Sequence, residues 1–278
     1  VISSQNDTNE ADRGKGYLHE LKDQQGVMEN IAAYSEEVTR VADIPGAIAD
    51  AFEYLRTHRP RPVHIQIPKD VLGREEAVEL VDGDRDASPP SPDPDRIEAA
   101  VDRLAEADRP MLLVGGGAAG AAAEVRRLVE QTGIPVASTV AGKGVVPDDH
   151  PLALGATIRH GDGAAYAADR DLVLAVGTEL SPRDTDDLPE ALIHVDVDYR
   201  NFGRNHPTEL GIVADAATAL EAIADGVEER DVRYDAAHRE AVADLKRDPL
   251  EAARNGDEDV EFDDRHRVLA TLRDALDA

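Results

Sequence analysis

An apolar run that ends in a glycine-rich turn restricts the fold of this chain more than any other feature. The segment Arg109–Gly120 reads Arg-Pro-Met-Leu-Leu-Val-Gly-Gly-Gly-Ala-Ala-Gly, and the helix-forming segment Ala121–Thr132 follows it. This order of strand, tight turn and helix is typical of α/β folds that bind a nucleotide phosphate at the turn. It also occurs in turns that bind nothing, so both interpretations stay open here. The glycines at G-x-G-x-x-G spacing are Gly115, Gly117 and Gly120.

The next strand argues against a dinucleotide site of the NAD type. Such a site needs an acidic residue about 20 positions beyond the glycines, where it holds the ribose hydroxyls. Here the second apolar run, Ile134–Thr139, ends in hydroxyl residues, and no carboxylate occurs between Glu130 and Asp148. An NAD-dependent dehydrogenase is therefore the third hypothesis.

The spacing of the apolar runs predicts an α/β protein. Helices or glycine turns separate the expected strands, which favours a parallel, doubly wound, Rossmann-like central domain. The expected strands are Met111–Val114, Pro135–Ser138, Asp171–Val176, Leu192–Val197 and Leu210–Val213.

The residues before this domain predict part of a second α/β domain. Ile44–Leu55 has helical spacing, and Val63–Ile67 alternates like a strand that Pro68 stops. One helix with two or three strands cannot close a core, so we expect the C-terminal part of a domain. The predicted organisation is a partial domain at 1–80, a Pro/Asp linker at 81–94, the central domain at 95–228 and a helical connector at 229–278.

The charge of the chain excludes several classes of partner. Asp and Glu number 58 against 30 Lys and Arg, giving a net charge of −28, and the acidic residues are spread along the whole length. Such a surface repels nucleic acid and anionic membranes. The pattern resembles proteins of salt-loving organisms, with an acidic mesophilic protein as the alternative. The absence of cysteine, of a membrane-length apolar run and of a secretory signal predicts a cytoplasmic protein.

Six motifs of the central region resemble, in order, the central domain of thiamine-diphosphate enzymes of the acetolactate synthase and benzoylformate decarboxylase type. They read Arg109-Pro-Met-Leu-Leu-Val-Gly-Gly-Gly, Gly133-Ile-Pro-Val-Ala-Ser-Thr, Gly142-Lys-Gly-Val-Val-Pro, His150-Pro-Leu-Ala-Leu-Gly, Asp171-Leu-Val-Leu-Ala-Val-Gly-Thr and His194-Val-Asp-Val-Asp. The first region agrees, since Gly14–Glu20 and Arg61–Asp70 resemble the second half of the family's pyrimidine-binding domain.

The resemblance implies an enzyme that uses thiamine diphosphate and Mg²⁺ to decarboxylate a 2-oxo acid or to join it to a second carbonyl. It also implies a homodimer or homotetramer. The family's activating glutamate would precede Val1, and its diphosphate-binding domain would follow this chain. We therefore expect no catalytic residue within these 278 residues, and a chain that is inactive alone.

Two departures bear on the reaction. Leu18-His19-Glu20 stands where acetolactate synthases carry Phe-Gln-Glu along the substrate channel, and Ala33 stands where they carry a lysine. These differences weaken the match to acetolactate synthase but not to the family. The resemblance makes His19 and Glu20 candidates for proximity to substrate or cofactor, with a histidine in a surface loop as the alternative for His19.

The Gly-Asp-Gly sequence at Gly161–Gly163 imitates the start of the family's magnesium motif. The asparagine that completes this motif is missing at the required spacing, because the first asparagine after it is Asn201. We therefore predict no metal ligand in this chain. Asp162 is instead expected near a helix N-terminus, where a carboxylate complements the helix dipole.

The central domain carries candidate nucleotide-binding residues at the carboxyl ends of its expected strands, where open α/β sheets bind ligands. Relatives hold FAD, ADP or nothing there, and the turn after Gly177 lacks the Arg-Phe-Asp pattern of the flavin-binding branch, which makes FAD doubtful. The candidates are Gly116, Gly117, Thr139, Gly142, His160, Gly177, Thr178, Asp196 and Asp215.

Two hypotheses precede the NAD-dependent dehydrogenase. The first is a piece of a thiamine-diphosphate-dependent 2-oxo acid decarboxylase or carboligase. The second is a nucleotide-binding or assembly subunit whose catalytic domain is encoded separately. What the parent reading frame encodes after Ala278 would discriminate between them.

Overall fold

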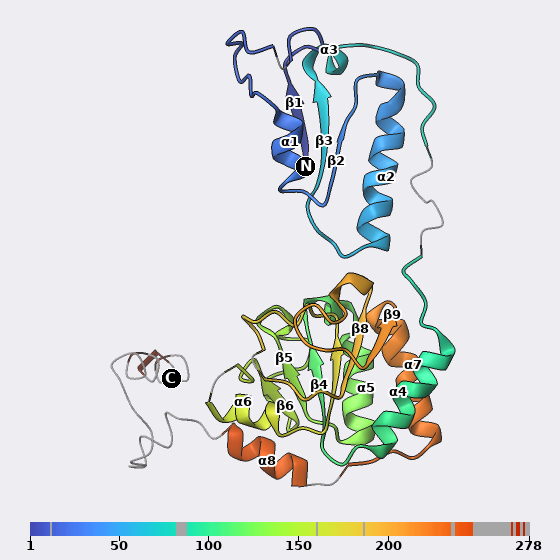
Figure 1. Cartoon of the computed structure of the whole chain (residues 1–278), viewed down its shortest axis with the longest axis vertical. Helices are drawn as coiled ribbons and strands as arrows, with labels where there is room; N and C mark the ends of the chain where they lie inside the picture. Colours follow the sequence, from blue (N-terminus) through green and yellow to red (C-terminus); the bar gives the residue numbers. More distant parts are fainter. Residues whose placement is uncertain are drawn as a thin grey trace. The chain divides into compact units, whose positions relative to one another are not determined.

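The computed structural model describes residues 1–11, 13–81, 88–159, 161–185, 187–234 and 237–246, with single residues at 268, 271, 272 and 275. The chain divides into two compact units (Figure 1). The first comprises Val1–Ser91 with Val213–Asp215, and the second comprises Pro92–Ile212 with Ala216–Ala278. The division falls inside the Pro/Asp segment predicted as a linker, whose residues 82–87 lie outside the described part.

The first unit contains a three-stranded parallel sheet in the order β1-β3-β2. Its elements are β1 (Ile2–Gln5), α1 (Gln24–Glu29), β2 (Tyr34–Glu37), the 3₁₀ helix η1 (Val41–Asp43), α2 (Ile44–Thr57), β3 (Val63–Pro68) and α3 (Lys69–Leu72). The proline after Ile44 lies in the first turn of α2, where its missing N–H costs no hydrogen bond.

The two faces of the central strand β3 have different chemistry. Ile65 and Ile67 lie in an apolar cluster with Ala47 and Ala51 of α2. Because side chains alternate along a strand, His64 faces the opposite way. It is fully buried, with Nε2 2.7 Å from the Ser3 hydroxyl and Nδ1 2.9 Å from the Ser35 hydroxyl. This face of the sheet is therefore polar.

The second unit contains a six-stranded sheet in the order β6-β5-β4-β7-β8-β9. The pairs β5–β6, β4–β5, β4–β7 and β7–β8 are all parallel. Its strands are β4 (Pro110–Val114), β5 (Val136–Ser138), β6 (Ala153–Gly155), β7 (Leu172–Val176), β8 (Leu192–Asp196) and β9 (Leu210–Val213). Its helices are α4 (Pro94–Glu106), η2 (Gly116–Ala121), α5 (Ala122–Thr132), η3 (Val140–Gly142), α6 (Gly161–Ala168), η4 (Tyr199–Asn201), α7 (Ala216–Glu229) and α8 (Ala237–Leu245).

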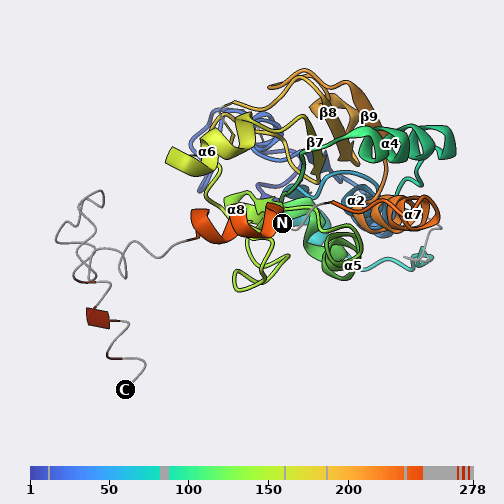
Figure 2. The ribbon, with the colours of Figure 1, turned by 90° about the horizontal axis from the view of Figure 1, so that it is seen from below.

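Numbered within the unit, this strand order is 3-2-1-4-5-6, the order of doubly wound dinucleotide-binding folds. Helices α4, α5 and α7 pack on one another at one face of the sheet, and α6 lies at the other (Figure 2). The predicted fold class is therefore confirmed. Strand β6, which has only three residues, was not predicted from the sequence.

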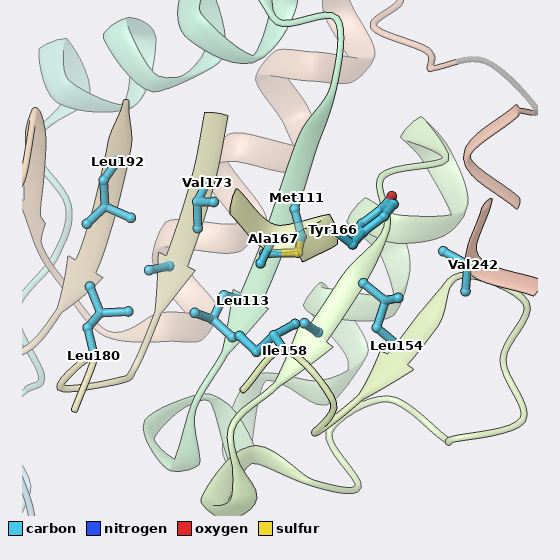
Figure 3. Close-up of a cluster of buried hydrophobic side chains, with 12 residues drawn as sticks. Met111, Leu113, Leu154, Ile158, Tyr166, Ala167, Val173, Leu180, Leu192 and Val242 are labelled. Carbon is cyan, nitrogen blue, oxygen red and sulfur yellow. The ribbon is translucent and has the colours of Figure 1, made fainter. Parts of the chain in front are cut away.

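A cluster of buried side chains fixes α6 and α8 against the sheet. Met111 of β4 and Val173 of β7 belong to this cluster with Tyr166 of α6 and Val242 of α8 (Figure 3). Val242 is fully buried, so α8 belongs to the core of the second unit although its sequence lies in the predicted connector. Most of the predicted connector after residue 246 lies outside the described residues.

Local sequence explains where the helices of the second unit begin and end. Asp93 caps α4 by accepting a hydrogen bond from the Asp95 N–H at 3.0 Å, and Pro94 takes the first helical position. Gly133 ends α5 in a left-handed conformation with φ of 78°, which glycine adopts without strain.

Candidate functional site

Seven of the predicted nucleotide-binding residues lie along one edge of the central sheet, at the carboxyl ends of β5, β4, β7 and β8. They are Thr139, Gly142, Gly116, Gly117, Gly177, Thr178 and Asp196. Asp215 follows β9 at the end of the strand order, and His160 lies outside the described residues. In a doubly wound sheet, ligands bind at this edge, in the crevice where the strand order reverses. That crevice lies between β4 and β7.

Backbone atoms of the two turns meet at this crevice. The Gly117 N–H donates to the Gly177 carbonyl at 2.9 Å, and the Gly115 N–H donates to the Val176 carbonyl at 2.9 Å. A Cβ atom on Gly177 would lie 2.6 Å from the Ala118 nitrogen, and one on Gly115 would lie 2.3 Å from the Gly177 oxygen. Only glycine therefore allows the two turns to approach this closely.

The turn after β5 packs on β4 in the same way. A Cβ atom on Gly142 would lie 2.3 Å from the Val114 carbonyl oxygen. The Gly142 N–H donates to the carbonyl of Thr139 at 3.0 Å and to its hydroxyl at 3.2 Å. Thr139 is buried and caps η3. Gly142 and Thr139 thus both have structural roles in joining neighbouring strands.

These contacts bear on the phosphate interpretation of the glycine turn. A diphosphate cradle needs backbone N–H groups that point at the ligand. In this turn the N–H groups of Gly115, Gly117 and Ala118 already donate to carbonyls within the protein. The helix N-terminus is also displaced, because η2 separates the turn from α5. The geometry therefore favours the interpretation of the glycine turn as a structural one.

The charges at this edge are also unsuited to a diphosphate. Glu179 follows β7. Asp196 is the last residue of β8, and Asp198 follows this strand. Arg200 makes two contacts with Asp198 at 2.8 Å, and Arg204 lies 3.8 Å from Glu179. The two arginines therefore already neutralise carboxylates of the protein.

His194 is a site residue that the sequence analysis missed. It is fully buried on β8, and its Nε2–H donates to the Thr178 carbonyl at 2.8 Å, which ties β8 to the turn after β7. Its Nδ1 has no hydrogen-bond partner among the described residues. Burial lowers the pKa of His194, although the Thr178 carbonyl and the Asp196 carboxylate act in the opposite direction. The side chain is therefore neutral at neutral pH.

The first unit holds a separate polar pocket beside His19. The pocket opens after the carboxyl end of β1, and Gln5, Asn6 and Gln24 line it together with His19 and Glu20. His19 is exposed and has φ of 62°, a conformation that few non-glycine residues adopt. The sequence placed His19 and Glu20 next to each other, but it gave no signal for Gln5, Asn6 or Gln24, which approach through folding.

The described residues contain no group of three or more His, Asp or Glu side chains placed to hold a metal ion. Asp162, from the Gly-Asp-Gly sequence that imitates a magnesium motif, lies in the first turn of α6. Its predicted place near a helix N-terminus is confirmed. There the carboxylate interacts favourably with the positive end of the helix dipole.

Comparisons with known proteins agree with the fold and its motifs. Residues 97–223 match the family model of the thiamine pyrophosphate enzyme central domain. A probable 2-ketoarginine decarboxylase of Pseudomonas aeruginosa is 40% identical over 80% of this chain. A probable acetolactate synthase large subunit of Methanocaldococcus jannaschii is 38% identical over 70%, and an acetolactate synthase large subunit of Corynebacterium glutamicum is 37% identical over 71%.

These matches place the chain in the family of thiamine-pyrophosphate-dependent enzymes, as its motifs predicted. The chain spans 41%, 36% and 34% of the length of the three relatives, respectively. The family match covers the edge that carries the glycine turns, while the pocket beside His19 lies outside residues 97–223.

The backbone contact at Gly177 predicts a large cost for Gly177→Ala. The left-handed φ of 62° disfavours alanine by about 1–2 kcal/mol, and the new methyl group would collide with Gly117 and Ala118 backbone atoms. We expect the free energy of unfolding to fall by more than about 2 kcal/mol. Urea denaturation followed by circular dichroism measures the change.

Two matched variants separate the cost of the left-handed backbone from the cost of the steric collision at the Cβ position. Gly203 is also left-handed, with φ of 68°, and Gly120 is not, while both have open space at the Cβ position. Gly203→Ala should therefore lose only about 1–2 kcal/mol, and Gly120→Ala should stay within about 0.5 kcal/mol of wild type. An equal loss for Gly177→Ala and Gly203→Ala would show that the backbone contact contributes nothing.

The buried His194 predicts a pH-dependent stability. Unfolded histidine takes up a proton near pH 6.5, whereas folded His194, with its lowered pKa, stays neutral. As the pH falls, the unfolded state therefore binds more protons than the folded state. The stability that neutral His194 contributes is complete above about pH 6.5 and is lost as the pH falls toward the pKa of folded His194. One such proton contributes at most about 1.4 kcal/mol per pH unit.

His194→Gln tests this linkage, because glutamine can keep a donor toward the Thr178 carbonyl and does not titrate. Urea denaturation between pH 7.5 and 5 should show a flatter decline in the variant than in wild type. Parallel declines would mean that His194 does not contribute to the pH dependence.

Proposed function

We propose that this chain supplies the pyrimidine-binding and central domains of an enzyme that uses thiamine diphosphate to decarboxylate a 2-oxo acid, with a resemblance to the acetolactate synthase large subunit. The family match over residues 97–223 carries the proposal. The identity of 38–40% over 70–80% of the chain extends it to the first unit. The proposed domains are 1–80 and 95–228, joined by a linker at 81–94 and followed by a connector at 229–278.

We assign contact with this cofactor or its substrate to the surface of the first unit beside His19. It lies after the carboxyl end of a parallel strand, where α/β proteins bind ligands. The imidazole of His19 can donate to a carbonyl or carboxylate oxygen. Bound thiamine diphosphate would supply the carbanion that adds to the substrate carbonyl. Mg²⁺ belongs to the proposal as the partner of the diphosphate, and no residue of this chain is assigned to it.

The first loop favours a decarboxylase over acetolactate synthase itself. Leu18, His19 and Ala33 depart from the synthase pattern, and the relative with 40% identity is named a probable 2-ketoarginine decarboxylase. Position 19 therefore presents an imidazole ring to the substrate, where the synthases present the carboxamide of glutamine.

An oligomer fits the surface of the first unit. Large apolar side chains are exposed there, including Leu18 at 80%, Ile31 at 64% and Phe52 at 54%. A second protein chain could cover apolar side chains of this kind. We propose a homodimer or homotetramer on this basis.

The cellular setting is proposed from composition. No helix in the described part of the chain is long and apolar enough to cross a membrane. The dispersed carboxylates keep water bound at the surface in concentrated salt, so we place the enzyme in the cytoplasm of a salt-loving organism. The proposal does not include FAD, because the glycine turns and their neighbouring carboxylates do not fit its diphosphate.

The proposal predicts a cofactor-dependent decarboxylation. The enzyme that contains these residues, supplied with thiamine diphosphate and Mg²⁺, should release CO₂ from a 2-oxo acid. Pyruvate and 2-ketoarginine are assayed side by side, and samples without thiamine diphosphate serve as the control. Acetolactate formed from pyruvate would indicate a synthase, and an aldehyde product a decarboxylase.

Absence of CO₂ release from these and other 2-oxo acids, at saturating thiamine diphosphate, would contradict the proposal. That outcome would favour the alternative, in which the chain is an assembly subunit of a separately encoded enzyme.

A further inference from the structure

The loop between β1 and α1 is held by two carboxylates at two separate points. Near its start, the Thr8 N–H donates to Asp70 Oδ1 at 2.8 Å, and the Thr8 hydroxyl donates to Oδ2 at 3.0 Å. Arg74 fixes this carboxylate through a contact of 2.5 Å. Asp70 lies in α3, directly after β3, so the first anchor belongs to the rigid part of the unit.

The second anchor is Glu20, which binds the loop itself. Its carboxylate accepts hydrogen bonds from the N–H groups of Gly14 at 2.6 Å, Gly16 at 2.6 Å and Tyr17 at 3.0 Å. Gly14 and Gly16 have φ of 63° and 79°, and such left-handed residues turn successive N–H groups inward to form a nest for an anion. Burial raises the pKa of Glu20, but these backbone donors outweigh it and hold the pKa below its usual range. Glu20 is therefore ionised at neutral pH.

His19 is strained because of this arrangement. Its left-handed conformation costs about 1–2 kcal/mol relative to ordinary backbone. A conformation of this kind persists only where the surroundings impose it. The bonds of the next residue, Glu20, to Gly14, Gly16 and Tyr17 close the chain into a loop that fixes the backbone at His19.

The pocket that His19 borders is itself prearranged. The Gln24 carboxamide donates to the Ser3 hydroxyl at 3.3 Å and to the Ser4 carbonyl at 3.2 Å, and the Gln5 carboxamide donates to Glu37. These bonds restrict the two carboxamides before any ligand arrives. Such preorganisation lowers the entropic cost of binding a polar ligand.

We propose that Glu20 is a positioning residue, whose carboxylate fills the backbone nest at Gly14–Tyr17 and so holds the His19 imidazole at the polar pocket, where it contacts the carboxylate or carbonyl oxygen of the 2-oxo acid. The substrate part of this inference rests on the proposed function. Glu20 itself faces backbone and does not contact the substrate. The sequence resemblance alone did not distinguish these two roles.

The variant Glu20→Gln tests this assignment, because an amide replaces one of the two accepting oxygens with a donor. In the 278-residue chain, the amide hydrogens of Gly14, Gly16 and Tyr17 should exchange at least about tenfold faster. The NMR signal of the His19 ring should shift or broaden. Glu10→Gln removes an equal charge from the same loop and should change neither quantity.

The enzyme loaded with thiamine diphosphate provides the second readout. For the 2-oxo acid that wild type decarboxylates fastest, Glu20→Gln should raise KM by about tenfold or more and lower kcat much less, because binding geometry is lost. Gly16→Ala disfavours the left-handed backbone that forms the nest, so it should give the same KM effect. Glu10→Gln should keep the wild-type KM.

The results discriminate between the two proposals. Faster exchange with an unchanged KM, or exchange and His19 signals equal to wild type, would overturn the positioning role of Glu20. A wild-type enzyme that releases no CO₂ would instead defeat the proposed function, and the exchange rates with the His19 signal would then decide the anchoring role by themselves.

Discussion

Contact between two backbone turns, one after β4 and one after β7, is the interaction on which the central domain depends. These strands are the middle of the sheet, where the strand order reverses. Helix α5 follows β4 and packs on one face of the sheet, and α6 precedes β7 and lies at the other face. The Gly117 N–H bonds to the Gly177 carbonyl, and each turn fills the space that a side chain would need in the other. Gly142 extends the same packing from β5 to β4. Backbone atoms of the three turns therefore pack against one another at this edge of the sheet.

This closure changes the meaning of the glycine motif. In a dinucleotide-binding fold the glycines let a phosphate approach the backbone. Here they let another segment of backbone approach, and the N–H groups of Gly115, Gly117 and Ala118 are bonded to carbonyls within the protein. The edge is therefore a structural centre of the domain, and His194 strengthens it from β8. We therefore propose the first unit, at the surface beside His19, as the part of this chain that contributes to the chemistry.

Much of the fold follows from the sequence, because apolar runs such as Met111–Val114 and Asp171–Val176 leave few alternatives to buried parallel strands. β6 was missed since three residues give too short a pattern to detect. A helical connector was expected at 229–278, but the packing of α8 on the sheet through Val242 was not, because burial depends on contacts distant in sequence.

The candidate sites were less predictable than the fold. Spacing identified the glycine turn but could not say whether phosphate or backbone meets it. His19 and Glu20 were chosen through a family resemblance that gave them one common role, whereas hydrogen bonds show that Glu20 binds the loop. Gln5 and Gln24 carry no motif, and only folding brings them to His19.

Calorimetric titration of ADP and FAD against the folded chain tests the central claim most directly, because both ligands carry the diphosphate that a glycine cradle would bind. We expect no heat of binding for either ligand, since the N–H groups of Gly115, Gly117 and Ala118 are bonded within the protein. Stoichiometric binding of either one, with protection of the Gly115–Gly117 amides by the ligand, would contradict it.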